Sequence, residues 1–225
     1  MRNLVITGHY GSGKTTYSLN LALEEASAGK SVALVDMDIV NPYFRSGDHA
    51  KALENAGIRV IVPLTLGTTS DAPQISAEIM GVFDSPPDVT IFDAGGDDVG
   101  ATALGRYSGI LGENGYEMRY VINAFRPMTD TAQKCAEILA EIEQASRLKA
   151  ASVVNNSNLG RETTATHILS SMAFAREVCR LTGLPLLEVV AAAEEAHDLR
   201  EKIESLRVIN YSVFSGQYSV FAKQV

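Results

Sequence analysis

Short runs of apolar and β-branched residues recur along the chain, and segments with helical spacing of apolar residues separate them. Because these runs are continuously apolar rather than alternating, we expect strands covered on both faces, as in a mostly parallel sheet. The pattern predicts an α/β fold, a three-layer sandwich whose sheet of about seven strands has helices on both faces. The expected strands are Leu4–Thr7, Val32–Asp36, Arg59–Val62, Val89–Asp93, Arg119–Asn123, Ser152–Asn155 and Leu186–Val190.

The helical segments have recognisable ends. Gly29 and Gly183 follow two of them, and glycine is the usual residue just beyond a helix. No break in composition divides residues 1–225, so we expect a single nucleotide-binding domain. From Val208 onward the chain is aromatic and mixed, and the pattern assigns no element to it. The expected helices are Thr15–Ala28, Asp130–Ser146, Thr164–Leu181 and Glu194–Ser205.

Composition narrows the partners and the compartment. The net charge is −8 and the basic residues are dispersed, so we expect neither a nucleic acid nor an anionic membrane as partner. No run approaches the roughly 20 apolar residues of a membrane span, and the first apolar run is too short for a secretory signal. Cys135 and Cys179 form no C-x-x-C pair, and the histidines show no metal-ligand spacing. We therefore expect a cytoplasmic protein.

Residues 8–15 read Gly-His-Tyr-Gly-Ser-Gly-Lys-Thr, which is the P-loop spacing G-x-x-x-x-G-K-T. The loop follows an apolar strand and precedes a helix, so its N–H groups and the helix dipole favour a bound polyphosphate. Lys14 is expected to bridge the β- and γ-phosphates as a catalytic residue, and the Thr15 hydroxyl to ligate Mg²⁺. The expected nucleotide-binding residues here are Gly8, Tyr10, Gly11, Ser12, Gly13, Lys14, Thr15 and Thr16.

A second segment, Val89-Thr-Ile-Phe-Asp-Ala-Gly-Gly, ends a buried strand in an acid and two glycines. It fits a Walker B strand followed by a D-x-x-G switch, which predicts that Asp93 helps to hold Mg²⁺ and that Gly96 offers its N–H to the γ-phosphate. Asp97 is expected to be the N-cap of a helix from Val99 towards Ile110. The alternative is that Asp97 or Asp98 binds a second metal or a cationic substrate.

A third segment, Val-Asp36-Met-Asp38-Ile-Val-Asn-Pro, places two acids at the carboxyl end of the second strand. That edge of an α/β sheet is where ligands bind. We expect Asp38 to accept a hydrogen bond from the attacking water and Asp36 to support the Mg²⁺ shell. The alternatives are a turn cap for Asp38 and a structural hydrogen bond for Asp36.

Together the three segments resemble the SIMIBI class of P-loop NTPases, which holds MinD, ParA, nitrogenase iron protein and CobQ/CobB-type proteins. The resemblance covers Met1 to about Ala193 and, more narrowly, the motifs resemble a group of small ATP-binding proteins. In that class the second acid of D-x-D orients the lytic water, which implies this role for Asp38.

The chain departs from the MinD and ParA pattern at His9. Those proteins carry at this position a second lysine that reaches the partner's nucleotide, whereas a neutral imidazole supplies no fixed charge. A nucleotide-sandwich homodimer is therefore left open. Arg45 is either a replacement for that lysine or a solvated loop charge.

The strand end Asn155-Asn156-Ser157-Asn158 bears on the choice of base. GTPases read guanine with the aspartate of N-K-x-D, and this segment has neither lysine nor aspartate. An asparagine side chain pairs well with the N6 and N7 edge of adenine. We therefore expect ATP, contacted by Asn155 or Asn156; the alternative is that these residues only form an Asx turn.

The sequence thus predicts a Mg²⁺-dependent, slow ATPase switch whose state is read by an unidentified effector protein. One alternative is a small-molecule kinase or ligase of the CobQ/CobB or dethiobiotin synthetase type, and another is a nucleotide sensor that does not hydrolyse ATP. The kinase or ligase needs polar groups beside the γ-phosphate. Its candidates are residues 65–70, Asp97, Asp98, Arg106 and Arg126.

Overall fold

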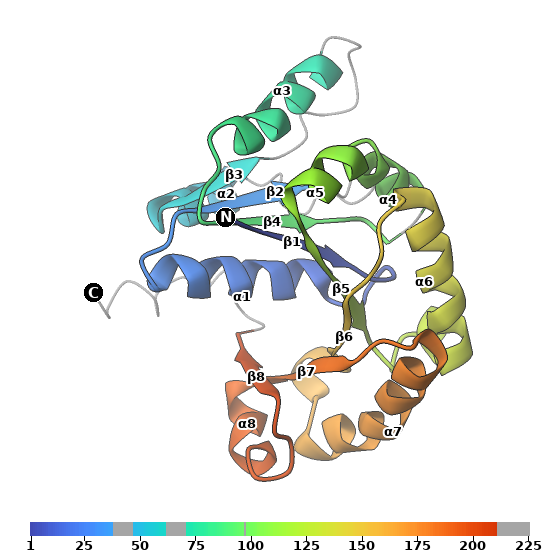
Figure 1. The fold of residues 1–225 in the computed structure, drawn as a ribbon. Helices are drawn as coiled ribbons and strands as arrows, with labels where there is room; N and C mark the ends of the chain where they lie inside the picture. Colours follow the sequence, from blue (N-terminus) through green and yellow to red (C-terminus); the bar gives the residue numbers. More distant parts are fainter. Residues whose placement is uncertain (38–46, 62–70, 97, 211–225) are drawn as a thin grey trace.

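The computed structural model describes residues 1–37, 47–61, 71–96 and 98–210. They form one eight-stranded sheet with the order β3-β2-β4-β1-β5-β6-β7-β8, in which all seven pairings are parallel. Figure 1 shows this sheet with helices on either side. The strands are β1 (Arg2–Thr7), β2 (Val32–Asp36), β3 (Ile58–Ile61), β4 (Val89–Asp93), β5 (Glu117–Ile122), β6 (Ser152–Asn155), β7 (Leu186–Ala192) and β8 (Leu206–Ile209).

The seven predicted strands are confirmed, and the sheet has one strand more. The predicted helix Glu194–Ser205 is only half present, because the chain leaves the helix after Leu199, turns, and enters β8. Strand β8 is four residues long, and among the described strands it pairs with β7 alone. The sequence analysis continued the last helix to Ser205 and assigned no element from Val208 onward, so this strand was missed.

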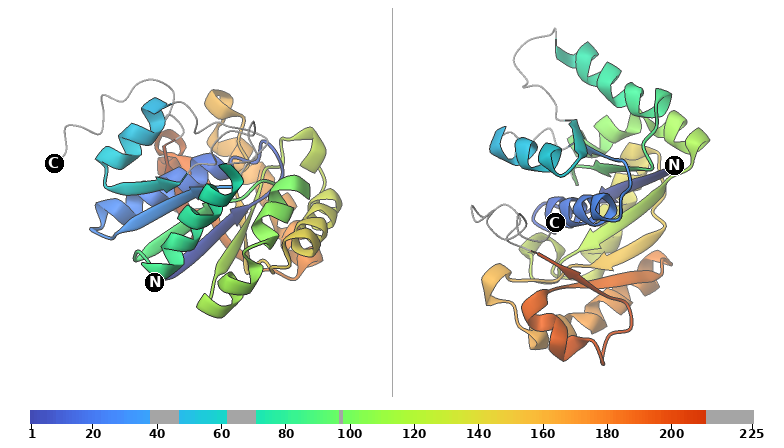
Figure 2. Two further views of the ribbon diagram at one scale, coloured as in Figure 1. Left: turned by 90° about the horizontal axis from the view of Figure 1, so that it is seen from above. Right: turned by 90° about the vertical axis from the view of Figure 1, so that its left-hand side faces the viewer.

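Helices fill the crossovers between strands. The segment expected to be one helix from Val99 to Ile110 is two helices, because α4 ends at Gly105, where a Cβ would lie 2.7 Å from the Ala145 oxygen. Figure 2 shows the helices from two further directions. The helices are α1 (Lys14–Ser27), α2 (Gly47–Asn55), α3 (Asp71–Asp84), α4 (Asp98–Gly105), α5 (Ser108–Asn114), α6 (Ala132–Ser146), α7 (Ala165–Thr182) and α8 (Ala193–Leu199). Short 3-10 turns lie at Pro127–Thr129 (η2) and Gly160–Glu162 (η3).

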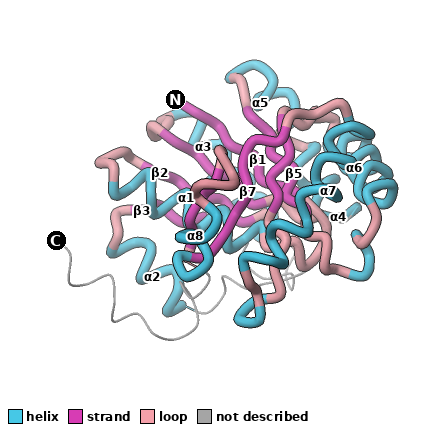
Figure 3. Tube along the Cα trace, turned by 90° about the horizontal axis from the view of Figure 1, so that it is seen from below, coloured by secondary structure: helices cyan, strands magenta, loops and turns pink. Residues whose placement is uncertain are grey.

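Each central strand contributes to two cores. On β1, Leu4 and Ile6 pack with α1 and α2, whereas Val5 packs with α4, α6 and α7 on the opposite face. Figure 3 shows α6 and α7 on one side of the sheet and α2 on the other. Burial on both faces explains why the strands are continuously apolar. None of the helices described is long and apolar enough to span a bilayer.

The all-parallel arrangement brings the carboxyl ends of the strands to one edge of the sheet. Strand β1 lies between β4 and β5, and β2 is the other neighbour of β4. The loop after β1, the acid that ends β4 and the loops after β5 and β6 therefore meet. This edge contains the candidate site.

Candidate nucleotide-binding site

The loop between β1 and α1 has the backbone of an anion cradle. Gly8, Gly11 and Gly13 have φ values of 149°, 77° and 87°. A Cβ on Gly8 would lie 2.2 Å from the Val121 oxygen, and one on Gly13 would lie 2.3 Å from the Asn156 amide nitrogen. Glycine is thus required at both positions, by backbone conformation and by space.

Helix α1 begins with an uncompensated N-terminus. Gly13 is its N-cap, without a capping side chain, and the first turn contains no acidic residue. The first N–H groups of a helix lack partners within the helix and carry partial positive charge. Thr16 lies in this turn. The arrangement suits a phosphate group.

Two polar side chains of the loop are nearly buried. Lys14 is 5% exposed, its Nζ donates to the His9 oxygen at 3.4 Å, and it forms no ion pair with any residue the structure describes. The Ser12 hydroxyl is buried without a hydrogen-bond partner among those residues. Tyr10, by contrast, is 70% exposed. A buried cation without a carboxylate partner is costly unless a ligand supplies the negative charge.

The acids of the neighbouring strands lie beneath the loop. The Thr15 hydroxyl donates to Asp93 Oδ2 at 2.7 Å, and the Ser18 hydroxyl donates to Asp93 Oδ1 at 3.2 Å. Asp36 is opposite Asp93 in the β2–β4 register, and both are almost fully buried. The structure therefore brings the three expected metal-binding residues together: Thr15 and Asp93 are in contact, and Asp36 is on the adjacent strand.

The segment after β4 is packed against the P-loop. A Cβ on Gly96 would lie 1.8 Å from the Gly8 oxygen, so the two backbones are as close as glycine permits. Gly96 is thus beside the loop, as expected of a switch residue. Asp38, Arg45, Asp97 and residues 65–70 lie outside the described residues, and so does the side chain of Asp98.

The two asparagines that were expected to contact the base are fully buried and bonded within the protein. Asn155 Nδ2 donates to the Ser171 hydroxyl at 2.9 Å, and Asn155 Oδ1 accepts from the Ser157 hydroxyl at 2.6 Å. Asn156 Nδ2 donates to the Ser12 oxygen at 2.8 Å. In this conformation Asn156 therefore stabilises the backbone of the P-loop.

The loop after β5 supports the P-loop, a role that the sequence analysis did not predict, although it named Arg126 as a candidate of the kinase or ligase alternative. Arg126 Nε donates to the Gly11 oxygen at 2.8 Å, so a second side chain supports the P-loop. Asn123, at the end of β5, donates to the Asn158 oxygen at 3.1 Å and links the loops after β5 and β6. The sequence did contain a signal for these contacts, because polar residues directly follow the buried strands β5 and β6. In a parallel sheet, the ends of these two strands lie at the same edge as the end of β1.

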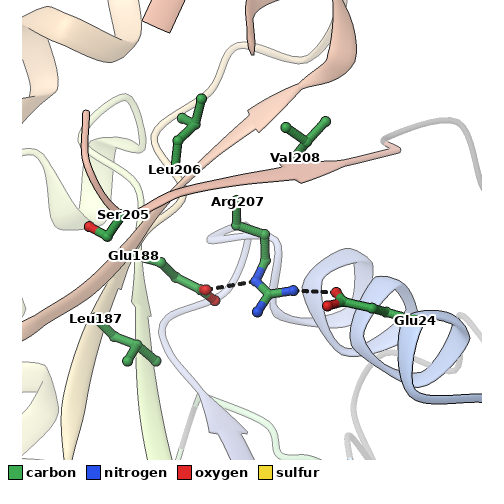
Figure 4. A pocket seen from close by; sticks show the side chains of 7 residues that line it. All are labelled: Glu24, Leu187, Glu188, Ser205, Leu206, Arg207 and Val208. Carbon is green, nitrogen blue, oxygen red and sulfur yellow. Dashed lines mark hydrogen bonds and ion pairs between the residues drawn. The ribbon is translucent and has the colours of Figure 1, made fainter. Parts of the chain in front are cut away.

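A second charged cluster, also missed, surrounds the middle of α1. Arg119 Nη1 donates to the Tyr17 hydroxyl at 2.7 Å, and Tyr17 in turn donates to Glu188. Glu188 also accepts from Arg207 Nε at 2.7 Å, and Arg207 pairs with Glu24 (Figure 4). Burial, and then the negative charge of Glu188, raise the pKa of Tyr17 above its ordinary value of 10.0.

Strands β7 and β8 and helix α1 line a pocket of about 410 Å³ beside this cluster (Figure 4). Its charged side chains, Glu24, Glu188 and Arg207, are bonded to one another. Among the described residues, each charged side chain of the pocket thus has an oppositely charged partner within the protein, unlike Lys14 at the N-terminus of α1. We interpret the cluster as a structural tie between α1 and the last two strands.

A family model and the fold of solved structures both place the chain in the SIMIBI class of P-loop NTPases, which bind nucleotides. The chain belongs to the CobQ/CobB/MinD/ParA nucleotide-binding domain family, whose model matches residues 4–206. The match covers the P-loop, all of β2 to β7, most of β1 and the first residue of β8. No significant match was found among curated proteins.

Solved structures with this fold include proteins of the signal recognition system. The cell division protein FtsY of Thermotoga maritima has a TM-score of 0.56 and 21% identity, over 95% of this chain and 66% of FtsY. FtsY of Mycoplasma mycoides has a TM-score of 0.55 and 16% identity, over 84% of this chain and 59% of that one. The signal recognition particle 54 kDa protein of Aeropyrum pernix, in complex with GDP, has a TM-score of 0.54 and 21% identity, over 84% of this chain and 41% of that one.

At these identities the likeness shows the fold alone. The chain spans about six tenths of the length of the two FtsY structures, of which it covers 66% and 59%.

Proposed function

We propose that this chain binds Mg-ATP and hydrolyses it slowly, as a switch whose nucleotide state is read by a partner protein. The observation that carries the proposal is the set of polar groups at the N-terminus of α1. Lys14 is buried there without a described carboxylate partner, above a Thr15–Asp93 hydrogen bond. Such a site supplies positive charge for a polyphosphate and oxygen ligands for a divalent cation.

The residues present fit a bound Mg²⁺. Thr15, Asp93 and Asp36 would hold it, directly or through water, because hydroxyl and carboxylate oxygens are the ligands that Mg²⁺ prefers. Its chemistry there would be to neutralise charge on the β- and γ-phosphate oxygens. The Thr15 hydroxyl now donates to Asp93, and it would turn its oxygen lone pairs towards the cation.

In the proposed reaction, a water oxygen forms a bond to the γ-phosphorus and the bond to the oxygen bridging the β- and γ-phosphorus breaks. The products are ADP, inorganic phosphate and a proton. Lys14 and the amides of the loop bind the phosphate oxygens on which negative charge increases. Asp38 is our candidate for the group that orients the water.

The preference for ATP rests on the residues after β6. Asn155-Asn156-Ser157-Asn158 contains no acid to accept the N1 and N2 protons of guanine. The amides of Asn155 and Asn156 now bond Ser171 and the Ser12 oxygen, so either must exchange a hydrogen bond to contact adenine. That contact remains a prediction. The bound GDP of the Aeropyrum pernix protein concerns that protein alone.

Slow turnover is expected because His9 supplies no fixed charge where MinD and ParA carry a lysine. A partner that reads the two states would recognise the segments that we expect the γ-phosphate to order, residues 38–45 and 95–98. Alternatively, the partner is a second copy of this chain, in a homodimer that lacks the lysine by which MinD and ParA reach the partner's nucleotide.

Calorimetry and a steady-state phosphate-release assay test the proposal. We expect Mg²⁺-dependent binding of ATP in preference to GTP, and slow hydrolysis without added substrate. Asp38→Asn should lower kcat and leave the ATP dissociation constant nearly unchanged, because the water makes its contact after ATP is bound. Tighter binding of GTP, hydrolysis only with an added metabolite, or an unchanged kcat in the variant would each contradict a part of the proposal.

A further inference from the structure

Arg126 contacts the P-loop at Gly11. Its Nε donates to the Gly11 oxygen at 2.8 Å. A Cβ built on Gly11 would lie 3.3 Å from Nε and 3.7 Å from Cζ, so the guanidinium occupies the space that a side chain at Gly11 would need. The arginine and the glycine thus make contact at the middle of the phosphate-binding loop.

The backbone that carries Arg126 is held in place. Arg126 is extended, with φ −103° and ψ 128°, as the following Pro127 favours. The Thr129 N–H donates to the Arg126 oxygen at 2.9 Å, and the Phe125 N–H donates to Asn123 Oδ1 at 3.0 Å. Because Asn123 is fully buried at the end of β5, this loop is anchored to the sheet beside β1.

The guanidinium has more donors than the P-loop uses. Of its five N–H bonds, only the one on Nε has a hydrogen-bond acceptor among the described residues. Arg126 is exposed and forms no ion pair with any of them. If Arg126 only supported the loop, its exposed positive charge would add little to the stability of the protein.

We propose that Arg126 contacts the polyphosphate of the bound nucleotide through its terminal nitrogens, and is the fixed cation that His9 fails to supply. This inference rests on the proposed function, because it needs a polyphosphate in the loop. Its Nε–Gly11 bond positions the guanidinium, and the planar fork then faces an anion with two parallel donors. The chain thereby provides in cis a charge that need not come from a second subunit.

Arg126→Gln is the decisive variant. Glutamine Nε2 is as many bonds from Cα as arginine Nε, so it can still donate to the Gly11 oxygen, but it carries no charge. Arg126→Lys keeps the charge and loses the Nε donor. Arg161→Gln is the matched control, since Arg161 is an exposed arginine of η3, beyond β6, without a described P-loop contact.

Calorimetry with Mg-ATP at two salt concentrations, together with urea unfolding, measures the effects. We expect Arg126→Gln to weaken binding by roughly 10- to 100-fold, the range of a charge-assisted hydrogen bond. Its affinity should also depend less on salt. Arg126→Lys should recover most of the affinity, while Arg161→Gln should match the wild type.

Two results would overturn the inference while leaving the proposed function standing. If Arg126→Gln binds Mg-ATP like the wild type, the side chain only supports the loop. If the Gln and Lys variants are equally weak and less stable to urea, its role is structural. A wild type that binds neither Mg-ATP nor Mg-GTP would instead remove both proposals together.

Discussion

Helix α1 contacts two groups of charged residues that are neutralised in different ways. At its N-terminus, Lys14 has a backbone oxygen as its described partner, and Asp93 accepts from two hydroxyls. Around Tyr17, one turn further along, Arg119 and Arg207 converge on Glu188. Both groups are largely buried.

The way in which the charges are neutralised distinguishes a ligand-binding site from a structural cluster. Where the protein pairs its own buried charges, as at Glu188, the site needs nothing from outside and holds the helix to the sheet. Where a cation and helix amides are buried without a described carboxylate partner, a ligand must complete the electrostatics. Burial and charge alone therefore do not mark a binding site, whereas incomplete pairing does.

The largest effect is expected at Glu188. Glu188→Ala removes the carboxylate that Arg119 and Arg207 share, although Arg119 keeps Glu117 and Arg207 keeps Glu24. We therefore expect a cost of about 3 kcal/mol, the lower end of the range for a broken buried pair. Urea denaturation measures the free energy of unfolding. Glu177→Ala, which breaks an exposed pair with Arg180 on α7, is the control and should change nothing measurable. Equal stability of both variants would refute the structural role of the cluster.

Lys14→Ala should instead weaken nucleotide binding and leave the stability of the protein nearly unchanged. The ammonium has no described ion pair to lose, so the free energy of unfolding should change little, whereas Mg-ATP binding should weaken roughly 10- to 100-fold. Calorimetry and urea denaturation of the same variant check both parts. If Lys14→Ala unfolds far more easily yet binds ATP normally, the contrast between the two groups of charges is wrong.

The smallest effect concerns alkaline pH. Because burial and Glu188 raise the pKa of Tyr17, the neutral phenol contributes stability that is fully present below the ordinary value of 10.0 and is lost as the pH rises above it. The free energy of unfolding should therefore fall above pH 10.0. Tyr17→Phe should fall less steeply over the same range. Identical slopes for the two proteins would show that Tyr17 does not cause the loss.

Much of this site was predictable because its signals are local. The P-loop spacing, the acid that ends β4 and the strands on either side follow from apolar runs and glycine positions. The bonds that connect Arg126 to Gly11 and Asn156 to Ser12 were not predictable. They join residues 115 and 144 positions apart, and no local pattern reports such a contact.

The base contact shows the same limit. Sequence reasoning selected Asn155 and Asn156 for their chemistry, which is correct for an adenine edge. In the structure Asn155 donates to Ser171 of α7 and Asn156 donates to the P-loop oxygen of Ser12, so the contact with the base stays a prediction. A side chain with two donors and one acceptor group can serve several partners, and only the packing around it decides which it contacts.

By itself, the sequence determined the local backbone: glycines that can adopt positive φ, and apolar runs that must be buried as strands. Those properties depend on each residue and its near neighbours. Only the tertiary structure decided which charges neutralise one another, because that depends on distances between strands far apart in the chain. Hence Glu188, 171 residues after Tyr17, became part of the core, while Lys14 was left facing the P-loop.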